Sequence, residues 1–221
     1  RRDATVDFGT NPCSEIILRP YQFCNLSEVV VRPEDTLNTL KEKVKTAAIL
    51  GTLQATLTNF RYLRKIWQDN TEEEALLGVS LTGITELKEE AIKTNKEWAE
   101  RLGINVSTAI TAVKPSGTVS QLVDSASGIH PRYSEQYVRR VRADARDPLC
   151  GVLEAAGVPV EDDVMSATTK VFSFPVKSPK DAIVATDMGA MEQLKLWEIY
   201  QDYWCEHKPS MTCYYRDDEF L

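Results

Sequence analysis

The alternation of strand-like and helix-like segments is the feature that most constrains how this chain folds. Short apolar runs bounded by polar residues have the pattern of buried strands, and longer stretches with apolar residues every three or four positions have the pattern of helices. Strands separated by helices of ten or more residues usually run parallel, because a parallel pair needs a long crossover connection. The pattern therefore predicts an α/β fold. It leaves open whether the strands form an open doubly wound sheet or half of an α/β barrel.

The predicted elements follow one another along the whole chain. The predicted strands lie at 15–18, 28–31, 75–82, 109–113, 137–141, 170–176 and 211–215. The predicted helices lie at 37–50, in a second stretch that reaches about Trp67, and at 87–102, 150–156 and 191–204. Gly51 is expected to interrupt the first helical region, and Gly103 is expected at a helix C-terminus.

Charge and hydrophobicity argue against two classes of partner. Lys and Arg total 26 against 33 Asp and Glu, and the resulting net charge of −7 argues against broad binding to nucleic acid. No apolar run approaches the ~20 residues that a membrane helix needs, and no signal peptide opens the chain. We expect a protein of the cytoplasm, or of the host cytoplasm if the chain is viral, that contacts neither nucleic acid nor membrane.

Both ends of the sequence predict that the chain is part of something longer. The first residue is Arg1 rather than methionine, and the last, Leu221, follows closely on a strand-like run. We therefore expect further segments on both sides.

The cysteines do not have the pattern of a disulfide framework or of a zinc site. There are five, an odd number, and no two have the Cys-x-x-Cys spacing. Cys205 and His207 are two positions apart, so they do not share a helix face, and no metal site is expected there. His207 is expected at a solvated helix end.

The segment Asn-Pro-Cys-Ser-Glu at 11–15 groups an amide, a thiol and a carboxylate at every second position. On an extended chain, residues at i−2, i and i+2 face the same side, so Asn11, Cys13 and Glu15 could act together. The alternative is a loop in which Cys13 is a small buried apolar residue. Spacing alone leaves both interpretations open.

This segment resembles the active-site loop of ribonucleotide reductase large subunits, which crosses a ten-stranded α/β barrel as a central finger loop. The resemblance implies that the Cys13 thiyl radical removes the 3′ hydrogen of the ribose. It implies that Glu15 is the general base on the 3′ hydroxyl and that Asn11 holds the ribose hydroxyls. A carboxylate within hydrogen-bond reach is suited to moving the hydroxyl proton.

Cys24, in Phe-Cys-Asn-Leu-Ser-Glu, extends the resemblance. In this family a second cysteine forms a disulfide with an upstream partner and delivers two electrons. The short spacing between Cys13 and Cys24 resembles the adenosylcobalamin-dependent ribonucleoside-triphosphate reductases more than the diiron-dependent enzymes. The partner of Cys24 would lie before Arg1.

A third match is Lys-Pro-Ser-Gly-Thr-Val-Ser-Gln at 114–121. A strand leading into a Ser/Gly/Thr-rich turn and then a helix exposes N–H groups that suit an anion, although an ordinary helix cap has the same pattern. The family has its substrate-phosphate loop in this order. The resemblance therefore implies a phosphate-binding role for Ser116, Gly117, Thr118, Val119 and Ser120. His130 and Arg132, just beyond, are expected to be structural.

Two further segments bear on the subclass. The run at 76–83 is similar to a strand typical of the cobalamin-dependent members. The pair Tyr214 and Tyr215 resembles the radical relay of the diiron-dependent class, where a partner subunit supplies the radical. Two consecutive tyrosines are also ordinary as one core and one edge residue.

Taken together, the resemblance implies that residues 1–221 form the C-terminal half of a ribonucleotide reductase barrel. The implied reaction is radical reduction of ribonucleotides, as triphosphates, to 2′-deoxyribonucleotides for DNA synthesis. The implied cofactor is adenosylcobalamin, with its cobalt. The implied partners are a ribonucleotide substrate, a nucleotide allosteric effector, a thioredoxin-type dithiol reductant and the missing N-terminal half.

Three alternatives stay open. The chain could be a class I large subunit with no bound cofactor, whose radical comes from a partner subunit. It could be an inactive fragment that binds a companion chain. A simple thiol redox protein is the weakest, because it would want a Cys-x-x-Cys motif or a basic neighbour of the thiol.

Overall fold

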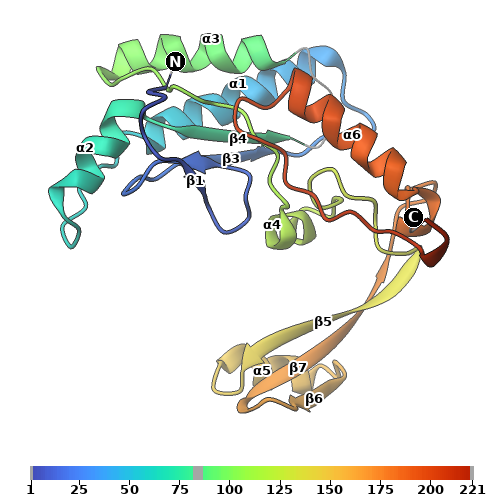
Figure 1. Ribbon diagram of the computed structural model, residues 1–221. Coiled ribbons are helices and arrows are strands. Elements are labelled where there is room, and N and C mark those ends of the chain that lie inside the picture. The colour runs from blue at the N-terminus through green and yellow to red at the C-terminus, as the bar shows by residue number, and fades with distance from the viewer. Residues whose placement is uncertain (1, 82–86, 220–221) are drawn as a thin grey trace. The chain divides into compact units, whose positions relative to one another are not determined.

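The computed structural model describes residues 2–81 and 87–219, which divide into two compact units (Figure 1). The first, which we call the core unit, contains the described residues up to His130 and those from Gly189 onward. The second, the hairpin unit, spans Pro131–Met188. Among the described residues, no helix combines the length and apolarity needed to cross a membrane.

A parallel strand pair lies at the centre of the core unit. Strands β3 (Asn25–Val29) and β4 (Leu77–Leu81) pair in parallel, so that Asn25 faces Leu77 and Val29 faces Leu81. The extended segment 109–113 lies along β4, where Leu77 and Val79 donate to its carbonyls at 3.1 and 2.8 Å. The predicted parallel arrangement is confirmed for this part of the chain.

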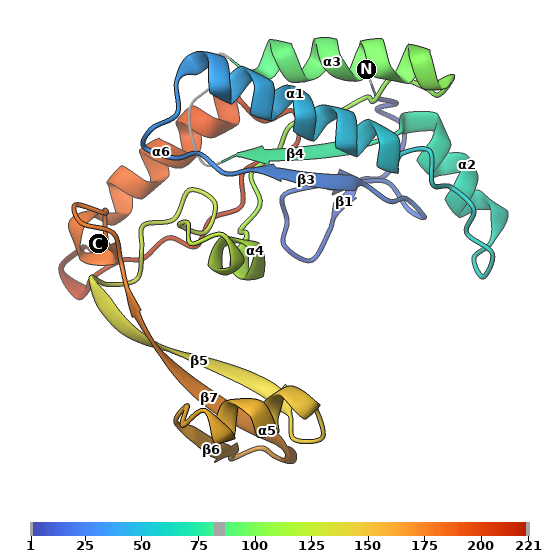
Figure 2. The same cartoon turned by 180° about the vertical axis from the view of Figure 1, so that it is seen from behind.

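Two helices cover one face of this sheet, as Figures 1 and 2 show from opposite sides. Helix α1 (Leu37–Gln54) begins at Thr36, whose hydroxyl caps the Thr39 amide, and α3 (Lys88–Leu102) ends at Gly103 with a φ of 68°. Helix α2 (Lys65–Glu74) lies between them in the sequence. The buried side chains of β4 and of α1 and α3 form the core: Leu77, Val79, Leu81, Val44, Ala48 and Ala91.

The expected break at Gly51 is wrong, because this glycine lies inside α1 and is buried. A Cβ on Gly51 would come within 3.1 Å of the Leu77 side chain. The glycine therefore marks a close approach of α1 to β4 rather than the end of a helix. The second helical stretch is shifted as well: it forms α2 and begins only at Lys65.

The C-terminal part of the core unit returns along the segment 109–113. Helix α6 (Ala190–Tyr203) ends at Trp204, whose indole N–H donates to the Ala112 carbonyl at 2.9 Å. The chain then runs beside Thr111 and Val113, and the backbone N–H of Ser210 donates to Val113 at 2.9 Å. A 3₁₀ turn at Asp217–Glu219 follows.

The predicted strand at 211–215 is wrong. The backbone N–H of Tyr214 donates to the Gln193 side chain at 3.0 Å, and the Tyr214 carbonyl accepts from the same amide at 2.8 Å. The amide of Gln193 thus occupies both hydrogen-bonding groups of Tyr214 that a neighbouring strand would have used.

The hairpin unit is antiparallel, which corrects the expectation of parallel strands there. Strand β7 (Ser166–Lys177) pairs with β5 (Gln136–Asp144) on one side and with β6 (Val160–Asp163) on the other. Helix α5 (Pro148–Ala155) follows β5 directly, and a 3₁₀ turn at Ala185–Asp187 closes the unit. The spacing between β5 and β7 is filled by α5 and by the extra strand β6 rather than by a crossover helix, so β5 and β7 run in opposite directions.

Two short elements of the core unit carry the sequence motifs. Strands β1 (Gly9–Thr10) and β2 (Ile17–Leu18) form a small antiparallel pair around residues 11–16. The one-and-a-half-turn helix α4 (Gly117–Leu122) follows the segment 109–113. The predicted strand at 76–83 forms β4, while its residues 82 and 83 lie outside the described ranges.

Candidate functional site

Residues 11–16 form a closed turn between β1 and β2, which we call the cysteine turn. The backbone N–H of Asn11 donates to the Ile16 carbonyl at 3.1 Å. The side-chain oxygen of Asn11 accepts from the Ile16 backbone N–H, also at 3.1 Å. Ser14 donates its backbone N–H to the Asn11 carbonyl at 2.9 Å and has a φ of 64°. Asn11 therefore holds the turn together through its side chain as well as its backbone.

The turn separates the thiol from the carboxylate. Cys13 is exposed at the outside of the turn, whereas Glu15 is fully buried at 0%. Of the two interpretations left open for this segment, the shared face of Asn11, Cys13 and Glu15 is wrong, because it needs an extended strand and 11–16 is a turn. The loop is present, although Cys13 is exposed in it rather than buried. The thiol is open to a reactant, and the carboxylate is shielded from water.

Glu15 has two unused acceptor oxygens. Neither Oε1 nor Oε2 has a hydrogen-bond partner among the described residues, and the Lys114 Nζ lies 3.7 Å from Oε1. The backbone carbonyl of Glu15 accepts from Lys208 at 3.1 Å, which fixes the residue in place. Buried carboxylate oxygens nearly always have donors, so this group is suited to accept hydrogen bonds from a bound hydroxyl compound.

Cys24 lies immediately before β3, next to the same carboxylate. Burial raises the pKa of its thiol well above the ordinary value, and the negative charge of Glu15 raises it further. A Cβ on Gly78 of β4 would come within 2.9 Å of the Ile16 side chain and 3.4 Å of the Cys24 sulfur. The Cys24 thiol therefore packs against the β4 backbone and stays protonated, as a hydrogen-donating thiol rather than a nucleophilic thiolate.

The segment Ser116–Ser120, which we call the predicted phosphate loop, uses some of its hydroxyls internally. The Ser116 hydroxyl donates to the Glu28 carboxylate, and the buried Ser120 hydroxyl lies 3.0 Å from the Ser127 hydroxyl. Gly117, Thr118 and Val119 are exposed at the first turn of α4, where N–H groups have no acceptor within the helix. An anion could therefore be bound by the backbone N–H groups of this turn and by the Thr118 hydroxyl, whereas the Ser116 and Ser120 hydroxyls have partners inside the protein.

Lys114 joins the cysteine turn to the predicted phosphate loop. Its ammonium group is the cation near Glu15, and its charge also opposes the rise in the pKa of Glu28 that burial causes. Its backbone N–H donates to the Ser80 hydroxyl at 3.0 Å. The structure therefore brings together the buried Glu15, the partly exposed Cys24 and the start of the loop, while Cys13 is exposed.

Glu28 is a member of the site that the sequence motifs did not single out. It lies in the apolar run that follows Cys24, where a half-buried glutamate has the pattern of an edge-strand residue. Its position opposite Ser80 in the parallel register, and hence beside Lys114 and Ser116, depends on strand pairing. Only a correct pairing of β3 with β4 could have identified it from the sequence.

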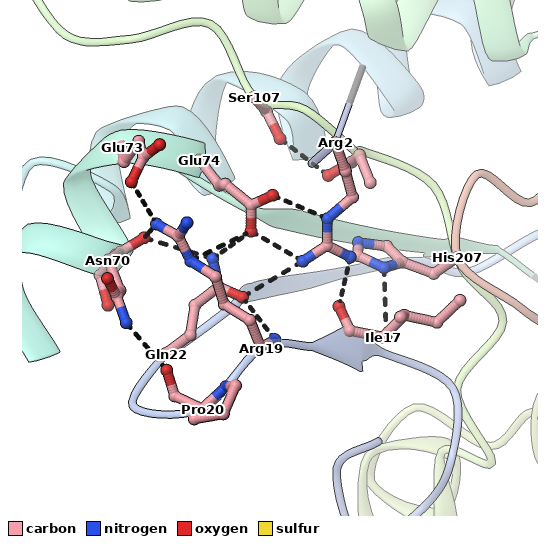
Figure 3. Close-up of polar contacts among 12 residues, drawn as sticks. Arg2, Ile17, Arg19, Pro20, Gln22, Asn70, Glu73, Glu74, Ser107 and His207 are labelled. Carbon is pink, nitrogen blue, oxygen red and sulfur yellow. Dashed lines mark hydrogen bonds and ion pairs between the residues drawn. The ribbon is translucent and has the colours of Figure 1, made fainter. Parts of the chain in front are cut away.

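A buried ion-pair network holds the chain on the other side of β2 (Figure 3). The Arg2 guanidinium donates to the Glu74 carboxylate from Nε at 2.8 Å and from Nη2 at 2.7 Å. Its Nη1 donates to the Ile17 carbonyl at 2.7 Å. Gln22 donates to the same Glu74 carboxylate. These hydrogen bonds, with the Arg2 ion pair, hold the pKa of Glu74 below its ordinary value although burial alone would raise it. The network fixes β2 and the segment before Cys24 against the end of α2.

His207 is buried at 2% exposure, so the expectation of a solvated helix end is wrong. Its Nδ1 accepts from the Ile17 backbone N–H at 3.3 Å, and its Nε2 donates to the Leu77 carbonyl at 2.9 Å (Figure 3). Burial lowers the pKa of the imidazole to about 4. The chain turns back beneath β4 after α6, and this return, which no local pattern indicates, places the imidazole between β2 and β4.

The remaining sequence-predicted residues lie outside this group. Tyr214 and Tyr215 are 41% and 65% exposed and belong to no strand, and their role as a radical relay stays a prediction. His130 accepts from the Thr212 backbone N–H at 2.8 Å and fixes the chain after α4. Within the part of the chain that the structure describes, no cluster of three or more His, Cys, Asp or Glu side chains is placed to hold a metal ion.

The sequence is similar to curated proteins over nearly its whole length. It is 27% identical over 258 aligned positions to the adenosylcobalamin-dependent ribonucleoside-triphosphate reductase of Lactobacillus acidophilus, with 96% of this chain covered. It is 30% identical, over 92% of this chain, to a Dictyostelium discoideum protein described as a probable enzyme of the same kind. The resemblance that the motifs predict is confirmed. No family model matches the sequence.

The chain spans about a third of the length of these relatives, 34% of the Lactobacillus protein and 29% of the Dictyostelium protein. A crystal structure of a B12-dependent, class II ribonucleotide reductase matches 97% of this chain and 36% of its own, with a TM-score of 0.77 and 24% identity. This likeness confirms the α/β fold.

The contacts of His207 predict a pH-dependent stability. The unfolded imidazole takes up a proton near pH 6.5 and the folded one only near pH 4, so the free energy of unfolding should fall as the pH drops through this window. The loss should be about 3 kcal/mol when complete. The measurement is urea denaturation, followed by tryptophan fluorescence, at several pH values. The variant His207→Gln should be less stable at pH 7.5 and should lose this part of the pH dependence; equal slopes for both proteins would contradict the assignment.

Proposed function

We propose that this chain, similar over nearly all of its length to adenosylcobalamin-dependent ribonucleoside-triphosphate reductases, is part of the catalytic barrel of such an enzyme. The reaction is the reduction of ribonucleoside triphosphates to 2′-deoxyribonucleotides for DNA synthesis. The observation that carries the proposal is the group formed by the buried Glu15 and the partly exposed Cys24 and Lys114, which lies between the exposed Cys13 thiol and the predicted phosphate loop in the sequence.

Cys13 and Glu15 start the reaction. As a thiyl radical, Cys13 removes the hydrogen atom from C3′ of the ribose and becomes a thiol. Glu15 accepts the proton of the 3′ hydroxyl through one of its two vacant oxygens. Asn11 keeps the turn closed and its side-chain nitrogen is available to the ribose hydroxyls. Because Cys13 is exposed and Glu15 is buried, the proposed reaction requires substrate binding to bring the thiol and the carboxylate to the same ribose.

Cys24 supplies reducing equivalents. Its thiol and that of a second cysteine, outside this chain, become a disulfide; the 2′ hydroxyl leaves as water and C2′ gains a hydrogen. Glu15 and Cys13 return the 3′ hydroxyl proton and the C3′ hydrogen, so that Cys13 is a thiyl radical again. The net consumption for each deoxyribonucleotide is two thiol hydrogen atoms, one found in the water and one on C2′. The protonated state of Cys24 suits this role, because a thiol can give up a hydrogen whereas a thiolate cannot.

The cofactor of the proposed reaction is adenosylcobalamin, which supplies radical chemistry when bound. The described residues fit it at one point: the Cys13 thiol is exposed, so a group bound against the cysteine turn can reach its sulfur. The surface that holds the corrin is expected in the part of the reductase outside this chain.

The other proposed partners follow from the same reaction. The disulfide at Cys24 requires a thioredoxin-type dithiol reductant, and the rest of the barrel must come from the N-terminal half of the enzyme. A nucleotide effector is expected to act on that half. We place the enzyme in the cytoplasm, where its nucleotide substrates are.

Replacing Cys13 by serine should abolish deoxyribonucleotide formation, because an O–H bond is too strong for the radical to form and return. The complete reductase that carries this chain should be assayed with ribonucleoside triphosphate, adenosylcobalamin and a dithiol. Cys150→Ser, at a cysteine of the hairpin unit, is the matched control and should retain turnover. Appreciable product from Cys13→Ser would rule out the radical assignment.

Replacing Cys24 by serine should separate radical initiation from reduction. The variant can still form a substrate radical but cannot reduce it, so free nucleobase should be released while deoxyribonucleotide is not made. Product analysis by chromatography distinguishes the two. Multiple turnovers at the wild-type rate would remove Cys24 from the redox pair.

Introducing a negative charge at Thr118 should weaken substrate binding at the predicted phosphate loop. Thr118→Asp should raise KM by about tenfold or more through repulsion of the phosphates. Thr118→Asn, of similar size and uncharged, is the control and should remain near the wild-type KM. If the two variants have the same KM, the phosphates bind elsewhere.

A further inference from the structure

Strand β3 connects the reducing thiol to the predicted phosphate loop. Cys24 directly precedes the strand, and Glu28 lies four residues further along it, near its carboxyl end. A strand rises ~3.3 Å per residue, so this rigid, paired element holds the two backbone positions about 13 Å apart. Any contact between Glu28 and the loop therefore also fixes the loop relative to Cys24.

Glu28 and its neighbour on β4 together hold the beginning of the loop. The Glu28 carboxylate accepts the Ser116 hydroxyl, and the Ser80 hydroxyl accepts the Lys114 backbone N–H at 3.0 Å. Glu28 and Ser80 are opposite each other in the parallel register. Two adjacent strand ends thus hold Lys114, just before the loop, and Ser116, its first residue, which are two positions apart.

The backbone at Ser116 needs such support. Ser116 has a φ of 47°, a left-handed conformation that is unfavourable for a residue with a side chain. From the other side, a Cβ on Gly128 would come within 2.3 Å of the Lys114 carbonyl, so the loop is tightly enclosed there. The strained serine is 4% exposed, and its hydroxyl is held by the Glu28 carboxylate.

The chemistry of Glu28 adds a second requirement. Its Oε2 is buried without a hydrogen-bond partner among the described residues, and burial raises the pKa of the carboxyl group. The facing charged groups are the Lys114 ammonium and, beyond it, the Glu15 carboxylate. The negative charge of a carboxylate beside a phosphate-binding loop would repel the substrate. The hydrogen bond from Ser116 to Glu28 is therefore the contribution of Glu28 that can favour substrate binding.

We propose that Glu28 is a positioning residue for substrate binding: through the Ser116 hydroxyl it holds the predicted phosphate loop at a fixed place relative to Cys24. The inference rests on the proposed function, because it concerns the triphosphate of that substrate. Glu28 touches neither the phosphate nor the reacting atoms and acts through Ser116.

The test compares three substitutions in the complete reductase, with CTP as substrate. Glu28→Ala removes the acceptor and should raise KM by about tenfold, as expected for the loss of a hydrogen bond to a charged group, while kcat stays within about twofold. Glu28→Gln keeps an acceptor oxygen and should restore KM to the wild-type value or below it. Ser27→Ala is the matched control: its hydroxyl donates to the Ala47 carbonyl of α1 at 3.0 Å, so it loses one hydrogen bond on the same strand but not at the loop.

A double-substitution cycle identifies the contact. Glu28→Ala and Ser116→Ala should not be additive, since either one alone breaks the same hydrogen bond. The inference is overturned if Glu28→Ala has the KM of Ser27→Ala, if Glu28→Gln is as impaired as Glu28→Ala, or if the two effects on KM multiply. If one of these three outcomes is found while the wild-type enzyme still makes deoxyribonucleotide, only the inference about Glu28 fails and the proposed function is retained. If the wild type makes none, the proposed function fails, and the same comparisons are made on the Kd for CTP, where unchanged affinity in Glu28→Ala overturns the inference separately.

Discussion

The buried imidazole of His207 is the contact on which the position of the cysteine turn depends. It links Ile17, 190 residues away in sequence, to Leu77, 130 residues away, and it does so with one acceptor and one donor nitrogen. Only the neutral ring offers both, so the pairing of β2 with the sheet depends on keeping a proton off this side chain. The Arg2–Glu74 pair secures the same strand from the other side. The motif that contains Cys13 is thus held in place by residues outside it.

Local patterns predicted the elements whose cause is local. The helices α1 and α3 and the Gly103 helix end are decided by neighbours a few positions away, and all are present. The failures lie where tertiary contacts decide. Gly51 continues a helix because a neighbouring strand leaves no room for a side chain, and Tyr214 is not in a strand because the Gln193 amide binds it. Strand direction in the hairpin unit depended on β6, which has no strong sequence pattern of its own.

The candidate site shows the same division. The order of the motifs placed Glu15, Cys24 and the predicted phosphate loop in one region, and the structure brings them together through Lys114. Of the two interpretations of 11–15, the extended segment is wrong, because the side chain of Asn11 accepts from Ile16 and closes a turn. Glu28 and His207 were not identified as parts of the site, since both matter through partners distant in the sequence. A residue type and its spacing can indicate chemistry, but a buried partner is found only when the strands are paired.

The packing of Cys24 against Gly78 has a consequence for how a disulfide at this position would be opened. Thiol–disulfide exchange is an in-line attack on one sulfur, and the other sulfur departs as the leaving group. The Cys24 sulfur lies with the Ile16 and Leu26 side chains around Gly78 of β4, and the residue is only partly exposed, so we expect an external dithiol to attack the sulfur of its partner. Cys24 would then be the departing thiol, and a group with so high a pKa departs slowly unless a proton reaches it as the bond breaks. Packing would therefore set the order of reduction: the partner cysteine would form the mixed disulfide, and Cys24 would be released as the thiol.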